Sequence, residues 1–195
     1  MATQAERRAS TRGAILTAAE TLFGQHGFTA TTMDQIAHAS DVAKGAIYHH
    51  FPTKEAVFEA VFQHASAKLA ADLGQSSGGA RDALAAMSQG VRAYFAACAE
   101  GPTGQIILKD GPAVLGWERW REIDAEHFGG MVPATLRAAM RSELIAHQPV
   151  EPLARLILGA VNEAAAACNA SSDPATTGRD YAQALEMLLE GLRIR

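Results

Sequence analysis

The segment from Thr31 to Phe51 constrains the fold most, because it specifies two short helices separated by a tight turn. Thr32 is a favourable N-cap residue, and Gln35 stands three positions later, where its side chain can reach back to complete a capping box. Asp41 supplies the turn, since Asp accepts the left-handed backbone conformation more readily than most residues. The segment is therefore predicted to fold as two helices packed across a turn.

The second of these helices has an outer face that suits the major groove of DNA. Its apolar positions Val42, Ile47 and Phe51 are expected to point inward, and the outward positions carry almost no acid. Lys can meet phosphates or base acceptors, Gly and Ala permit close approach, and Tyr and His can donate to phosphate oxygens. The outward residues are Lys44, Gly45, Ala46, Tyr48 and His49. Taken alone, the same pattern fits a plain helical hairpin with a polar outer face better.

The flanks of the segment favour DNA binding over that alternative. Phe51-Pro52 ends the second helix, and Thr53-Lys54-Glu55 begins the next one, so Lys54 lies in its first turn beside the same surface. Upstream, an apolar stripe at helical spacing precedes a helix stop at residues 26–28; the stripe consists of Ile15, Ala18, Ala19, Leu22 and Phe23.

Residues from about Thr11 to Phe62 resemble the N-terminal domain of the TetR family of one-component transcriptional regulators. The matching pieces are Ala18-Ala19-Glu20-Thr21-Leu22-Phe23, Gly27-Phe28, Thr31-Thr32-Met33, Ile36-Ala37, Val42, Lys44-Gly45, Ile47-Tyr48-His49-His50-Phe51-Pro52 and Lys54-Glu55. The family usually has Gly where Asp41 stands, and Ser or Thr where Ala43 and Ala46 stand. The recognition helix therefore has a weaker cap and fewer hydroxyl groups, which bears on the bases it reads.

The resemblance implies a homodimeric repressor that binds a palindromic double-stranded DNA operator and releases it when a small-molecule effector binds. The residues expected to form the DNA-binding surface are Thr32, Ala43, Lys44, Gly45, Ala46, Tyr48, His49 and Lys54. In TetR relatives the last two helices pair with their copies in a four-helix interface. Here those helices are expected at Glu151–Ala170 and Thr176–Leu192, with Leu185 and Leu189 in the interface.

Composition predicts an all-α fold, because the chain is 48% hydrophobic, rich in alanine and without strand-like alternation. We expect a three-helix DNA-binding head over residues 1–52 and a helical body for ligand binding and dimerisation over residues 53–195. The net charge of −4 is unevenly distributed: residues 1–54 carry five Lys and Arg against four Asp and Glu, and the remainder is acidic. A local basic face, which includes Arg7, Arg8 and Arg12, matters more for DNA than the total charge.

The body contains a group of aromatic and sulfur-bearing residues that predicts a site for an apolar small molecule. Its members are Met87, Tyr94, Phe95, Cys98, Trp117, Trp120, Phe128 and Met131. Each of them taken singly is more often a core residue than a pocket residue. Trp117 and Trp120 stand three positions apart, so both are expected on one side of a helix, where a flat ligand could lie against them.

Other functional classes find little support in the sequence. The seven histidines form no cluster with ligand spacing, and no phosphate loop, nucleophile elbow or zinc motif is present, so no metal, cofactor or enzymatic activity is expected. Glu118, Glu122 and Glu126 recur at the spacing of a solvated helix face. No signal peptide or membrane span is evident, which predicts a cytoplasmic protein, and Cys98 and Cys168 are predicted to be buried thiols. The alternative function is a helical small-molecule-binding or scaffold protein without DNA binding.

Overall fold

A computed structural model describes residues 3–76, 79–99 and 101–194 of the chain. Within these ranges the regular secondary structure is helical, and the one β-type pairing is an isolated antiparallel bridge between Ile145 and Arg193. The all-α prediction is therefore confirmed. None of the described helices is both long enough and apolar enough to cross a membrane.

The chain divides into two compact units that do not follow a single cut in the sequence. The first unit combines the chain up to Ala65 with Gly101–Trp120, and the second combines Ser66–Glu100 with Arg121–Arg195. The division of function between residues 1–52 and 53–195 remains a prediction, since compactness does not test it.

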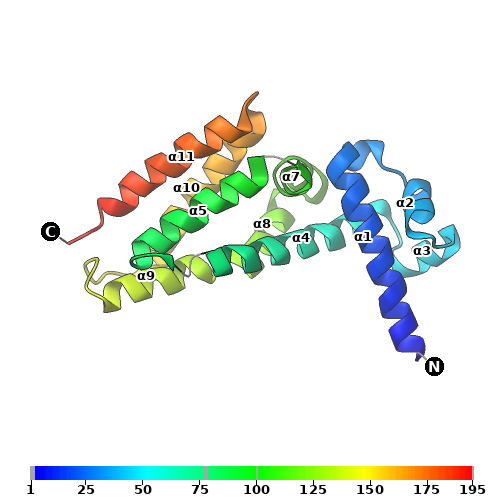
Figure 1. The fold of residues 1–195 in the computed structure, drawn as a ribbon, viewed down its shortest axis with the longest axis horizontal. Helices are drawn as coiled ribbons and strands as arrows, with labels where there is room; N and C mark the ends of the chain where they lie inside the picture. Colours follow the sequence, from blue (N-terminus) through cyan, green and yellow to red (C-terminus); the bar gives the residue numbers. More distant parts are fainter. Residues whose placement is uncertain (1–2, 77–78, 100, 195) are drawn as a thin grey trace. The chain divides into compact units, whose positions relative to one another are not determined.

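The first unit begins with three helices, α1 (Gln4–Ala30), α2 (Met33–Ser40) and α3 (Lys44–His50), which lie beside one another in blue in Figure 1. The first helix begins at Gln4, because Thr3 caps it and Glu6 completes a capping box with Thr3. Gly27 has a φ of 76° and interrupts the helical backbone, so the predicted stop at residues 26–28 is a kink followed by a final turn.

The N-terminal cap of α2 and the turn between α2 and α3 are formed by the predicted residues. The hydroxyl of Thr32 accepts from the Gln35 N–H and the Gln35 side chain accepts from the Thr32 N–H, so the capping box is formed. Asp41 has a φ of 52° and a ψ of 39°, in the left-handed region. Ala43, at the N-cap of α3, makes no side-chain capping bond, which is the weak cap expected from a non-polar residue there.

These helices are held together by a buried apolar core that the start of α4 (Lys54–Ser76) completes. The ring of Phe58 meets those of Phe23 and Phe28 edge-on, with centroids 5.2 and 5.3 Å apart. Ile36 of α2 and Ile47 of α3 are fully buried, which fixes the outward faces of both helices. The core of this unit includes Ile15, Ala19, Phe23, Ile36, Ile47, Phe51, Val57, Phe58, Val61 and Phe62.

The remainder of the first unit is α6 (Gly101–Gly104), a π-helical stretch η2 (Gln105–Asp110), α7 (Gly111–Leu115) and the start of α8 (Trp117–Phe128). This segment packs against α1: a Cβ on Gly24 would lie 2.3 Å from the Pro102 Cβ, so the two backbones approach as only glycine permits. Gly111-Pro112 does not interrupt the helical run from η2 into α7. Pro112 stands in the first turn of α7, where a missing N–H is tolerated, and the break falls at Gly116, whose φ is 77°.

The segment is tied to the end of α1 by one carboxylate. Asp110 Oδ2 accepts a hydrogen bond from the backbone N–H of Phe28 at 2.7 Å, and its Oδ1 accepts from the Gln105 amide at 3.1 Å. A hydrogen bond from a backbone N–H to a charged carboxylate is strong, and this one is made directly after the Gly27 kink.

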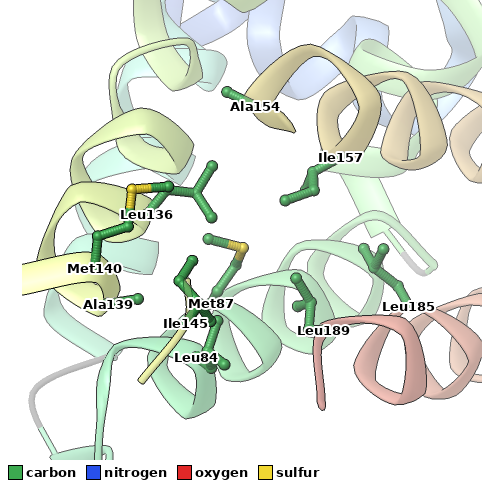
Figure 2. Packing of buried hydrophobic residues seen from close by; sticks show 10 residues of the cluster. All are labelled: Leu84, Met87, Leu136, Ala139, Met140, Ile145, Ala154, Ile157, Leu185 and Leu189. Atoms are coloured by element: carbon green, nitrogen blue, oxygen red, sulfur yellow. The ribbon is translucent and has the colours of Figure 1, made fainter. Parts of the chain in front are cut away.

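The second unit contains the rest of α4 and of α8 together with α5 (Ala83–Ala99), α9 (Met131–Arg141), α10 (Val150–Ala170) and α11 (Pro174–Glu190). Gly129 and Gly130 separate α8 from α9. Figure 2 shows apolar side chains of α5, α9, α10 and α11 converging on one core, which consists of Leu84, Met87, Leu136, Ala139, Met140, Ile145, Ala154, Ile157, Leu185 and Leu189.

Candidate DNA-binding surface and ligand cavity

The outward face of α3 lies on the side of the helix away from the buried Ile47. Lys44, Gly45, Tyr48 and His49 are exposed, with Tyr48 45% exposed, and Ala46 is half-buried. Gly45 has open space where a Cβ would stand, so a base or phosphate can approach the backbone closely there. The predicted arrangement of this helix is present, and the contacts of its residues with DNA remain predictions.

Lys44 already forms an ion pair that a DNA phosphate could replace. Its ammonium lies 2.6 Å from a carboxylate oxygen of Asp34 on α2, and both side chains are more than half exposed. The hydrogen bond from Lys44 to Asp34 and their Coulomb attraction raise the pKa of Lys44, which keeps it charged. An ion pair this exposed contributes little to stability, so a DNA phosphate can replace Asp34 at small cost.

Lys54 has a different environment from the one that the sequence suggests. Its ammonium donates to the carbonyl oxygens of Phe28 at 2.8 Å and Thr31 at 2.9 Å, and it lies 4.1 Å from the centre of the Phe28 ring. Lys54 thus binds the C-terminal carbonyls of α1 and holds α4 against it. Thr32 likewise uses its hydroxyl in the cap of α2.

Basic side chains from α1 gather near the end of α3. The guanidinium of Arg12 lies 5.0 Å from the centre of the Phe51 ring. The pKa of His50 is lowered, first by desolvation and then by the nearby charges of Arg8, His49 and Arg12. Because α1 extends to Gln4, these arginines are held on a helix beside the recognition helix.

A cavity of about 190 Å³ lies within the second unit, among α4, α5, α8, α9 and α10. Its lining is mostly apolar, and it consists of Leu73, Ala86, Met87, Gly90, Val91, Tyr94, Asp124, Phe128, Met131, Val132, Thr135, Leu158, Val161 and Asn162. An apolar hollow with a few polar groups is the usual form of a small-molecule site.

Asp124 is the one acid among the described residues of this cavity, and sequence reasoning missed it. Burial raises its pKa to about 6, and the charge of Arg121 on the same helix opposes the shift only partly. Its charge in turn contributes to the raised pKa values of Tyr94 and Cys98, which places it near both groups of α5. The available signal was its position four residues after Trp120 and four before Phe128, on the apolar stripe of the helix.

Comparison with known proteins identifies both parts of the chain. Residues 15–61 match the family model described as bacterial regulatory proteins, tetR family. Residues 84–192, more than half of the chain, match the model described as tetracyclin repressor-like, C-terminal domain. The chain belongs to the TetR family. It is a DNA-binding transcriptional regulator, and the resemblance seen in its first third is confirmed.

Individual TetR-family proteins agree with this assignment. A crystal structure of a TetR-family transcriptional regulator from Pectobacterium atrosepticum has a TM-score of 0.89 and 28% identity, and the match covers 100% of this chain and 99% of that one. The Transposon Tn10 TetC protein of Escherichia coli is 22% identical over 80% of this chain and 79% of its own length. The transcriptional repressor KstR2 of Mycolicibacterium smegmatis is 40% identical, but over only 28% of this chain and 27% of its own length.

The structure brings together half of the residues that were expected to line a ligand site in the TetR-type body. Met87, Tyr94, Phe128 and Met131 line the cavity. Phe95 lines a separate hollow between α5 and α11, and Cys98 is buried beside Tyr94. A role of these two residues in ligand binding remains a prediction.

Trp117 and Trp120 lie in the first compact unit, whereas every residue lining the cavity belongs to the second. Their rings stack with centroids 4.9 Å apart, so the prediction that they share one side is confirmed. The indole N–H of Trp120 donates to the Ile107 carbonyl, and its side chain is almost fully buried. Trp120 is thus part of the packing of α8 on η2, and Trp117 is half exposed beside it.

The expected dimer contacts need correction. Leu185 and Leu189 are 7% and 1% exposed and belong to the core of one chain, so they are not free to meet a second copy. The apolar residues that α10 and α11 leave exposed are Leu156, Tyr181, Met187 and Leu188. The pairing of α10 and α11 with their copies remains a prediction, and in it Leu185 and Leu189 cannot be the contact residues.

Both cysteines are buried, as predicted. Burial raises the pKa of Cys98 to about 12 and also raises that of Cys168. At neutral pH both are protonated thiols, which are poor nucleophiles.

Proposed function

We propose that this TetR-family chain is a homodimeric repressor that occupies a palindromic operator and releases it when a small molecule enters the cavity of the second unit. It acts without catalysis, and in the cytoplasm, where its DNA partner lies. The observation that carries the proposal is the face of α3, where Lys44, Gly45, Tyr48 and His49 point outward while Ile47 is buried against the other helices of the head.

A palindrome requires two recognition helices about 34–36 Å apart, one turn of DNA, and therefore a dimer. The apolar side chains that α10 and α11 expose support pairing through these helices, because burial of such residues drives association. Leu156, Met187 and Leu188 are each at least 67% exposed in the single chain.

Release by a ligand requires that the ligand bind the DNA-incompetent conformation more tightly, since equal affinity for both conformations shifts nothing. The cavity supports this part of the proposal because it can accept a small molecule within the body. Its lining also includes Leu73, which belongs to α4, the helix that begins in the first unit at Lys54.

The test of DNA binding is a gel shift with the region upstream of the chain's own gene. Tyr48→Ala should weaken binding by about 1–3 kcal/mol, roughly 5- to 150-fold, because Tyr48 is the largest side chain on the outer face of α3. His26→Ala removes an exposed ring of α1 in the same unit and should leave affinity unchanged. Equal affinity of the Tyr48 variant and the unmodified protein would contradict the placement of α3 in the groove.

A further inference from the structure

The cavity of the second unit has an unusual balance of charge. Among its described lining residues Asp124 is the one acid, and no Lys, Arg or His stands with it. The remaining polar groups are the Tyr94 hydroxyl, the Thr135 hydroxyl and the Asn162 amide, all of them neutral. A ligand that enters therefore meets an apolar wall with a single ionisable carboxyl.

Asp124 has no hydrogen bond or ion pair with any residue in the part of the chain that the structure describes. The nearest basic group that acts on it is Arg121, one turn earlier on α8, whose side chain is exposed to solvent. Buried carboxylates are normally paired, because an isolated charge in an apolar environment is costly. Among the described residues, Asp124 thus forms no ion pair within the cavity.

We propose that the effector is a lipophilic cation, an apolar molecule with one ammonium group that pairs with Asp124. The inference rests on the proposed ligand-binding function of the cavity and names the ligand's chemical class. A cation supplies the missing partner, and their attraction is strong where water is excluded. A neutral ligand would bury the carboxyl further without compensation, and an anion would be repelled by it.

The rest of the lining suits the apolar part of such a molecule. Phe128 and Tyr94 lie edge to face, with ring centroids 6.0 Å apart, and aromatic faces near a carboxylate also attract an ammonium group. Met87 and Met131 are flexible and polarisable, so they can adapt to an alkyl or aryl body of varied shape.

A charge series on one carbon skeleton tests the inference: 4-phenylbutylamine, 4-phenylbutan-1-ol and 4-phenylbutyrate, titrated into the full-length protein at pH 8 by calorimetry. At this pH Asp124 is ionised and the amine is protonated. We expect the amine to bind about tenfold or more tightly than the alcohol, and the carboxylate most weakly. Asp124→Asn, which keeps the shape of the side chain, should abolish the preference for the amine. Glu126→Gln removes an exposed acid of the same helix and should preserve it.

The outcomes separate the two proposals. If the alcohol or the carboxylate binds as tightly as the amine, the cavity is a ligand site but the inference is wrong. If none of the three binds, or if Asp124→Asn retains the amine preference, the inference is also wrong. The gel shift, measured without ligand, decides DNA binding independently. The series on the unmodified protein remains decisive even if the Asp124 variant does not fold.

Discussion

The two compact units place charged side chains in opposite environments. On the first unit, Lys44 and Asp34 form an exposed pair whose members can change partners, whereas in the second Asp124 is desolvated and lacks a partner among the described residues. An exposed pair costs little to break, so it suits a surface that must bind and leave a polyanion. A desolvated carboxyl discriminates strongly between ligands of different charge, because electrostatic interactions are stronger at low dielectric.

The largest effect is expected where a new charge enters the core of the second unit. Leu189→Glu would bury a carboxylate at a position 1% exposed and should destabilise the fold by about 3–5 kcal/mol or more. Leu188→Glu, one residue earlier and 67% exposed, should leave the fold intact and weaken dimerisation. Denaturant unfolding and sedimentation measure the two effects. A Leu188 variant that remains fully dimeric would place the interface elsewhere.

A smaller effect is expected from removal of the half-buried carboxylate of Asp124. The pKa of Asp124 is raised to about 6 in the folded state from an ordinary 3.8, so the folded state holds its proton more tightly. The resulting penalty is absent below about pH 4, grows as the pH rises between the two values and is complete above the folded-state pKa. Asp124→Asn should therefore stabilise the protein by roughly 1–3 kcal/mol at pH 8 and change it little at pH 4.

The measurement is urea unfolding of both proteins at the two pH values, with Glu126→Gln as an exposed control. Equal stability of the Asp124 variant and the unmodified protein at pH 8 would mean that the carboxylate is solvated, and the contrast between the units would disappear.

The smallest effect concerns the exposed pair on the first unit. Asp34→Asn frees Lys44 for phosphate and should tighten operator binding only slightly, because an exposed ion pair contributes little. The same change removes a favourable acid from the first turn of α2, so a stability loss of ~0.3–1 kcal/mol is expected with it. A gel shift at two salt concentrations measures the first effect, and Asp72→Asn is an exposed control. Weaker DNA binding with unchanged folding would mean that Asp34 positions Lys44 rather than competing for it.

The head was predictable because its signals are local. Capping by Thr32 and Gln35, the left-handed Asp41 and the buried Ile47 each act within a few residues, and the structure has all of them as expected. Sequence reasoning did not identify Lys54 as the residue that binds the carbonyls of α1, because that contact joins positions 26 and 23 residues apart.

The body was predictable only in outline. Its helices follow from apolar periodicity, but which apolar residues meet depends on tertiary packing, so Leu185 was expected in an interface and is in the core. Trp120 and Phe128 lie on one helix yet belong to different compact units. The regular spacing of Glu118, Glu122 and Glu126 indicated a solvated face of that helix and drew attention away from Asp124 on its apolar side.

The carboxylate of Asp110 accepts its hydrogen bond from the main chain at position 28 rather than from a side chain. In a genetic screen this makes the contact asymmetric: a replacement of Phe28 retains the donor, whereas a replacement of Asp110 by Ala loses the acceptor. Among changes at position 28, only proline, which has no backbone N–H, would remove the donor that an Asp110→Ala mutant leaves unpaired. Other second-site revertants would introduce a new acceptor, and position 105, where the Gln105 amide lies 3.1 Å from the Asp110 carboxylate, is one place for it.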